Sequence, residues 1–201
     1  MPVKGPYGGP EGGTNPAVVY PIMTIAMNAL GALTAWGIYW WNPSRYDRKI
    51  AVLKDLNLGY LYVAVRILAL VLSFQQVFVA VCRKKAKADN PDQYVYATQL
   101  REEPVVRLVM EGPIGEFNRA QRSIDNTREL FPVVLADVVL GGFVFPLTML
   151  VCVCLYFCAR LAFSFGYVRG AKSRMPGQAV SFILTMLMGG LMLFSGVKSL
   201  L

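Results

Sequence analysis

Residues 17–41 carry no formally charged side chain, and this stretch constrains the fold of the 201-residue chain more than any other feature. A helix needs about 20 consecutive apolar residues to cross the hydrocarbon core of a bilayer. The apolar core of a signal peptide is shorter and follows a basic patch, whereas the first 16 residues are rich in Gly and Pro and hold one lysine. We therefore predict a membrane-spanning helix that is not cleaved.

Four further apolar segments follow, in a chain with 55% hydrophobic residues. They predict helices of membrane length over 56–82, 117–142, 146–168 and 179–201. Gly141, Gly142 and Pro146 form a turn signal inside an apolar run, so the third and fourth helices should make a tight helical hairpin. The sequence thus predicts an all-α integral membrane protein.

The basic residues are distributed unevenly among the connecting segments. Residues 1–16, 83–122 and 169–174 carry 1, 8 and 3 Lys or Arg, whereas 45–54 and 198 carry 4 and 1. By the positive-inside rule, the N-terminus and the two richer loops face the cytosol, or the mitochondrial matrix. Topology thus explains the net charge of +8, and we expect no nucleic-acid partner.

The four cysteines lie in or at the end of apolar segments, where free thiols pack as small hydrophobic groups. The chain contains no histidine, which excludes His-based catalytic triads and His ligation of haem. A zinc site of ordinary ligand spacing has little support, and we expect no metal.

The third apolar segment begins with the polar stretch EFNRAQRSIDNTRELFP. Charged groups at membrane depth are costly and often functional. Arg122, Asn126 and Glu129 stand at positions i, i+4 and i+7, so they share one helical face, while Arg128 points elsewhere. This face offers both charge signs and an amide to a ligand.

In the fourth segment Arg160, Tyr167 and Arg174 recur every seven residues and should form one stripe. If this stripe faces the polar face of the third helix, the two enclose groups that suit a small peptide with several charges. Alternatively, these side chains snorkel or pair only with one another. Arg66 and Asp137, deeper in their helices, are interpreted as a structural pair.

Together the two stretches resemble the family of membrane-associated proteins in eicosanoid and glutathione metabolism (MAPEG), which includes the microsomal glutathione transferases and leukotriene C4 synthase. The family pattern R-x-x-x-N-x-x-E-x-x-P is matched by Arg122, Asn126, Glu129 and Pro132. The family segment A-R-L…G-Y…R is matched by Ala159, Arg160, Leu161, Gly166, Tyr167, Arg169 and Arg174. The stretch CRKKAKADNP, which contains Arg83, is similar to the end of the family's first helix, most of all in the type-3 microsomal transferase.

The resemblance implies a MAPEG-like four-helix bundle over 56–201 that forms a homotrimer. Outside this bundle, the chain has a Gly/Pro-rich tail at 1–16 and an extra transmembrane helix with a basic loop at 17–55. It also implies glutathione as co-substrate and a lipophilic second substrate that arrives from the lipids of the endoplasmic reticulum or a mitochondrial membrane. Arg174 would activate the thiol. The glutathione-binding residues would be Arg83, Arg122, Asn126, Glu129 and Tyr167, supported by Arg160, Arg169 and Pro132.

Three positions depart from the family, which commonly has Gln or His in place of Ile124 and, in its leukotriene synthase branch, aromatic residues with a hydroxyl in place of Leu130 and Phe163. Each lost hydrogen bond to a charged ligand costs about 1.5–3 kcal/mol. Two functions therefore stay open: a membrane-bound glutathione transferase or peroxidase, and a non-catalytic accessory subunit of a larger membrane complex such as one of the respiratory chain. A channel or transporter is disfavoured because the chain shows no inverted repeat.

Overall fold

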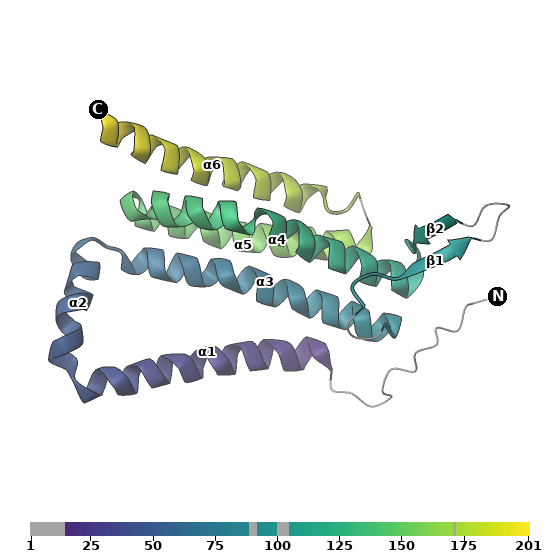
Figure 1. The fold of residues 1–201 in the computed structure, drawn as a ribbon, viewed down its shortest axis with the longest axis horizontal. Coiled ribbons are helices and arrows are strands. Elements are labelled where there is room, and N and C mark those ends of the chain that lie inside the picture. The colour runs from purple at the N-terminus through teal and green to yellow at the C-terminus, as the bar shows by residue number, and fades with distance from the viewer. Residues whose placement is uncertain (1–14, 89–91, 100–104, 171) are drawn as a thin grey trace.

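The computed structural model describes residues 15–88, 92–99, 105–170 and 172–201. Over these residues the chain forms six helices and one two-stranded antiparallel sheet (Figure 1). The elements are α1 (Pro16–Trp41), α2 (Pro43–Asp55), α3 (Gly59–Ala86), β1 (Tyr96–Gln99), β2 (Val105–Leu108), α4 (Gly112–Val144), α5 (Pro146–Arg169) and α6 (Met175–Leu200). The five long helices lie side by side, α2 runs between the ends of α1 and α3, and the strands extend from the opposite end of the bundle.

Four of the described helices, α1, α3, α5 and α6, are long and apolar enough to cross a membrane. The predicted helix at 117–142 is present as part of α4, but α4 is not among these four. Its second half still contains Arg128, Glu129 and Asp137, which break the apolar run. The all-α membrane fold is nevertheless confirmed, and α4 completes the bundle by packing against α3, α5 and α6.

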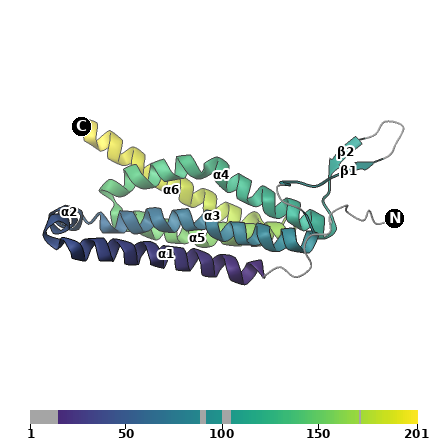
Figure 2. The ribbon, with the colours of Figure 1, turned by 60° about the horizontal axis from the view of Figure 1, so that its bottom comes forward.

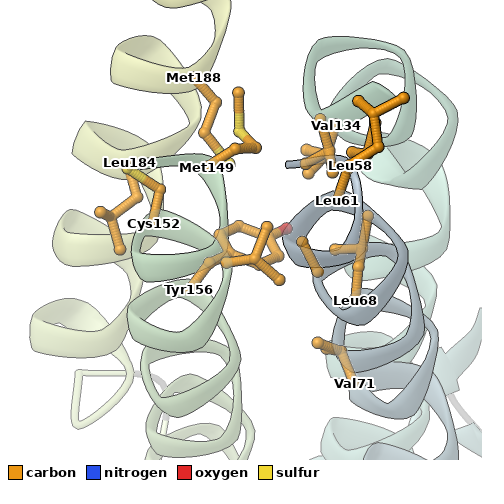
Figure 3. Close-up of a cluster of buried hydrophobic side chains, with 13 residues drawn as sticks. Leu58, Leu61, Leu68, Val71, Val134, Met149, Cys152, Tyr156, Leu184 and Met188 are labelled. Carbon is orange, nitrogen blue, oxygen red and sulfur yellow. The ribbon is translucent and has the colours of Figure 1, made fainter. Parts of the chain in front are cut away.

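The core of the bundle lies where α3, α4, α5 and α6 meet. Leu68 of α3, Val138 of α4, Tyr156 of α5 and Met188 of α6 are at most 1% exposed and belong to one cluster. Figure 3 shows Met149, Cys152 and Tyr156 of α5 between Leu184 and Met188 of α6 and the leucines of α3. Lipid is as apolar as these side chains, so close packing holds the helices together in a membrane.

The predicted turn between the third and fourth membrane helices is confirmed. Helix α4 ends at Val144 and α5 begins at Pro146, so a single residue, Phe145, connects them. Its main-chain N–H donates to the carbonyl of Gly141 at 2.9 Å. Proline suits the first turn of α5 because its missing N–H has no partner within the helix there.

Helix α1 lies along the outside of α3 in both views (Figures 1 and 2) and has no buried residue. The Nε atom of Arg66 donates to the Oδ1 atom of Asn28 at 2.7 Å, which ties α3 to α1. The predicted pair of Arg66 and Asp137 is therefore wrong. Asp137 is buried in α4 and faces Gly189, and no ion pair in the described residues includes it.

Two elements were not predicted. Residues 43–55, expected as a basic loop, form α2, because the Asn42 side chain accepts a hydrogen bond from the N–H of Arg45 and caps the first turn. Between α3 and α4, β1 and β2 pair in the register Tyr96 to Leu108. The described residues of 92–110, here called the β-hairpin, project beyond the ends of the helices (Figure 2).

Candidate functional site

A cavity of about 320 Å³ lies between α4, α5 and the start of α6, at the end of the bundle that carries the β-hairpin. It brings together four of the predicted site residues. The lining consists of Arg122, Asn126, Phe163, Tyr167, Arg174, Met175 and Gln178. No group of three or more His, Cys, Asp or Glu side chains gathers as a metal site anywhere in the described residues.

Arg122 of α4 forms an ion pair with Glu129, two turns further along the same face. The Nη1 atom lies 2.8 Å from Oε1, and the two side chains are 50% and 56% exposed. An ion pair in such contact with solvent contributes at most about 1 kcal/mol, so either partner is readily available to a charged ligand. Arg128 pairs instead with Asp125 at 3.3 Å, as its predicted orientation requires.

Arg160 of α5 is fully buried behind the cavity. Its Nη2 atom donates to Asn126 Oδ1 at 3.1 Å, and its Nε atom donates to Thr127 Oγ1 at 3.1 Å. Its guanidinium carbon lies 4.4 Å from the centroid of the Phe163 ring. None of these partners is a carboxylate, so the guanidinium fixes the Asn126 amide and adds positive potential behind the cavity.

Arg174 reaches the cavity through a turn. Helix α5 ends at Arg169 and α6 begins at Met175, so the predicted stripe with Tyr167 is not continued by one helix and that interpretation is wrong. The turn folds back onto α5 because Gly166 has no side chain: a Cβ atom there would lie 2.2 Å from the Ser173 carbonyl oxygen. The Arg174 guanidinium consequently lies 4.6 Å from the centroid of the Tyr167 ring.

Five other predicted site residues do not line this cavity: Arg83, Glu129, Pro132, Arg160 and Arg169. The guanidinium of Arg83 lies 4.7 Å from the centroid of the Phe117 ring, and that of Arg169 lies 4.0 Å from the centroid of the Phe165 ring. Pro132 is inside α4, where it cannot donate a main-chain hydrogen bond to the preceding turn.

The three departures from the family pattern have different consequences for the cavity. Ile124 is 1% exposed and packs with Phe117 and Ala120 in a second apolar cluster, so it does not line the cavity. Leu130 is exposed on α4 and also lies outside the lining. Phe163 alone of the three is part of the wall, so it is the one departure of the three that makes the cavity less polar than the family pattern implies.

A second cavity of about 180 Å³ lies on the other side of Arg122 and Tyr167, under the β-hairpin. It was not predicted, although Asn118 and Arg119 belong to the polar stretch that begins α4. Its lining consists of Tyr94, Tyr96, Leu108, Met110, Asn118, Arg119, Arg122 and Tyr167. The two cavities therefore share two side chains.

The β-hairpin is attached to α4 by Asn118, which is 1% exposed. Its Oδ1 atom accepts from the N–H of Val95 at 2.9 Å, and its Nδ2 atom donates to the carbonyls of Val95 and Val109, both at 2.8 Å. The Tyr94 hydroxyl donates to Asp125 Oδ2 at 2.6 Å. Burial raises the pKa of the Tyr94 hydroxyl and this hydrogen bond raises it further, so the group remains a proton donor at physiological pH.

Substituting Asn118 by alanine should loosen the attachment of the β-hairpin to α4. Three hydrogen bonds are lost, each contributing about 0.5–1.5 kcal/mol, so hydrogen exchange at the Val95 amide should accelerate about 10-fold or more. Hydrogen-exchange mass spectrometry of the detergent-solubilised protein measures this. Arg107→Ala, at an exposed position of β2, is the control and should leave exchange at Val95 unchanged. Equal exchange in the two variants would contradict the attachment.

One comparison with known proteins identifies a family. The model of the MAPEG family matches residues 61–194, about two thirds of the chain, from within α3 to within α6. The match includes the helices that line the cavity and leaves α1 and α2 outside it. A comparison with curated proteins finds no significant match. The chain is thus an integral membrane protein that belongs to the MAPEG family.

Proposed function

We propose that this protein is a membrane-bound glutathione transferase or peroxidase that acts on lipophilic electrophiles or lipid peroxides. The observation that carries the proposal is the cavity that gathers Arg122, Asn126, Tyr167 and Arg174 in a member of a family active in glutathione and eicosanoid metabolism. Its volume of about 320 Å³ is at the lower end of the roughly 300–1,000 Å³ typical of small-molecule sites.

Glutathione has two carboxylates, one ammonium group and one thiol, and the site offers partners for one carboxylate, the ammonium group and the thiol. The guanidinium of Arg122 can hold a carboxylate through two parallel hydrogen bonds. Glu129, which forms an ion pair with Arg122, is the acceptor for the ammonium group. The Asn126 amide and the Tyr167 hydroxyl supply neutral hydrogen bonds to the peptide units.

Arg174 is the residue that we assign to the thiol. A thiol has an unperturbed pKa of about 8.5 and is mostly protonated at neutral pH, whereas an adjacent guanidinium stabilises the thiolate. The thiolate then forms a carbon–sulfur bond to the electrophile while the leaving group departs. With a peroxide, the thiolate takes the terminal oxygen, an alcohol leaves, and a second glutathione reduces the sulfenic product to the disulfide.

An apolar groove of about 460 Å³ between α5 and α6 supports a lipophilic second substrate. Some residues that line the groove are adjacent in the sequence to residues that line the cavity. Ala162 precedes Phe163, and Pro176 follows Met175. An electrophile dissolved in the bilayer therefore has an apolar surface on α5 and α6, the two helices that also line the candidate glutathione cavity.

Glutathione should bind to the purified protein in detergent, as measured by isothermal titration calorimetry. Asn126→Ala removes an amide from the cavity and should weaken binding about 2- to 10-fold, because a neutral hydrogen bond contributes about 0.5–1.5 kcal/mol. Asn28→Ala, which removes an amide on α1, is the matched control and should bind glutathione normally. Absence of binding to the unmodified protein would refute the proposal.

The alternative, a non-catalytic accessory subunit, is favoured by one observation. Helix α1 has no buried residue and exposes large side chains such as Trp36 and Trp40, which offer an extended surface to another membrane protein. Native mass spectrometry separates the two functions. A homotrimer supports the enzyme, whereas stable co-purification with different subunits supports the accessory role.

A further inference from the structure

The cavity under the β-hairpin is held open by hydrogen bonds that do not depend on a ligand. Besides the three bonds of Asn118, Arg119 donates through Nη1 to the carbonyl of Met110 and through Nε and Nη2 to the carbonyl of Val168, at 3.1 and 3.0 Å. These bonds join the β-hairpin, α4 and the end of α5. The compartment is therefore preformed, as small-molecule sites usually are.

The wall of this compartment keeps a positive charge. All three hydrogen bonds of Arg119 within the described residues go to neutral main-chain carbonyls, and none of the ion pairs found there includes it. The nearby carboxylate of Asp125 already accepts from Tyr94 and Arg128. For Arg122, the second cation in the lining, the ion pair found in the described residues is an exposed one with Glu129. The compartment thus favours an anion.

The opposite wall of the compartment is aromatic and apolar. Tyr94 and Tyr96 contribute phenol rings, while Leu108 and Met110 contribute apolar groups. Tyr96 and Leu108 are directly paired across the two strands, so their side chains form one continuous face. Tyrosine rings and a thioether make favourable contacts with another aromatic ring.

We propose that the compartment under the β-hairpin binds a small aromatic carboxylate, with its ring against Tyr96 and its charge toward Arg119 and Arg122. Because Arg122 and Tyr167 line both cavities, a ligand bound here lies next to the candidate glutathione site. Binding itself needs no glutathione. Use of such a ligand as an electrophile rests on the proposed function and needs a halide on the ring: the thiolate bonds to the ring carbon that carries the halide, and the halide leaves.

The test uses 4-nitrobenzoate, which is unreactive, and its neutral counterpart 4-nitrobenzamide, titrated into the purified full chain in detergent. The benzoate should bind about 10-fold or more tightly than the amide, because charge-assisted hydrogen bonds are the stronger ones. Tyr96→Ala should weaken benzoate binding about 3- to 10-fold, and Tyr96→Phe should retain it. Tyr96 is 58% exposed, so these substitutions leave the bundle intact.

Val106→Ala is the matched control, because Val106 is on the neighbouring strand, is 65% exposed and lies outside the lining. It should bind the benzoate normally. No benzoate binding, equal affinity for the amide, or an unchanged affinity in Tyr96→Ala would overturn the inference. Glutathione is titrated into the same proteins as a separate test of the proposed function. Failure to bind glutathione is thus distinguishable from failure to bind the benzoate.

Discussion

Replacing Gly177 with alanine is expected to lower the melting temperature of the detergent-solubilised protein by about 5–10 °C and to abolish glutathione binding. A Cβ atom at this position would lie 2.4 Å from the main-chain nitrogen of Phe163 and 2.8 Å from the Ala159 carbonyl oxygen. Main-chain atoms cannot rotate away as side chains do, so α5 and α6 must separate. Overpacking of this kind costs about 1–3 kcal/mol or more.

The sign of this effect distinguishes packing from helix propensity. Alanine favours a helix over glycine by about 1 kcal/mol, so a loosely packed position would gain stability. Gly190 is such a position on the same helix, because a Cβ atom there meets nothing within 4 Å. Gly190→Ala should leave the melting temperature unchanged or raise it. Similar melting temperatures for the two variants would contradict the close crossing of α5 and α6.

Arg174→Ala is expected to reduce glutathione conjugation about 100- to 1,000-fold in kcat/KM, which a chloronitrobenzene substrate measures. Losing one group that stabilises developing charge in an active site typically has an effect of this size. The dependence of the rate on pH tests the physical reason for this effect. In the proposed mechanism the guanidinium lowers the thiol pKa, so the rate of the unmodified protein should level off below about pH 8.5, whereas the rate of the variant should keep rising through that pH.

Two further variants make this result specific to Arg174. Arg169→Ala removes an equally charged side chain that stacks on Phe165 outside the cavity, and it should retain nearly full activity. Arg174→Lys keeps the charge without the planar fork and should retain intermediate activity. An unchanged rate and pH profile in Arg174→Ala would remove this residue from the proposed chemistry.

Much of the fold follows from the sequence because the length of an apolar run decides whether a helix crosses a membrane. The turn at Phe145 was predictable from the flanking Gly and Pro residues. The partner of Arg66 was not predictable. It depends on how α1 lies against α3, and Asn28 is 38 residues away in the chain. The β-hairpin has strands of four residues, which are too short for a reliable alternating pattern.

In the candidate site, too, some features were predictable from the sequence and others were not. The relation of Arg122 to Glu129 follows from helical periodicity alone, and the structure reproduces it as an ion pair. The position of Arg174 depends instead on the turn after α5, which no periodicity describes. Ile124 shows a further limit, because a residue type that looks like a lost contact in the sequence proves to be part of an apolar cluster.

The attachment of the β-hairpin through Asn118 and Arg119 also has an evolutionary consequence. Both anchors lie in the first turns of α4, outside the apolar cluster where α3, α4, α5 and α6 meet. Insertions or substitutions in the β-hairpin can therefore accumulate without disturbing the packing of the membrane helices. Selection can thus act on ligand preference and on the stability of the helix bundle through separate parts of the chain. Related sequences should diverge fastest between α3 and α4.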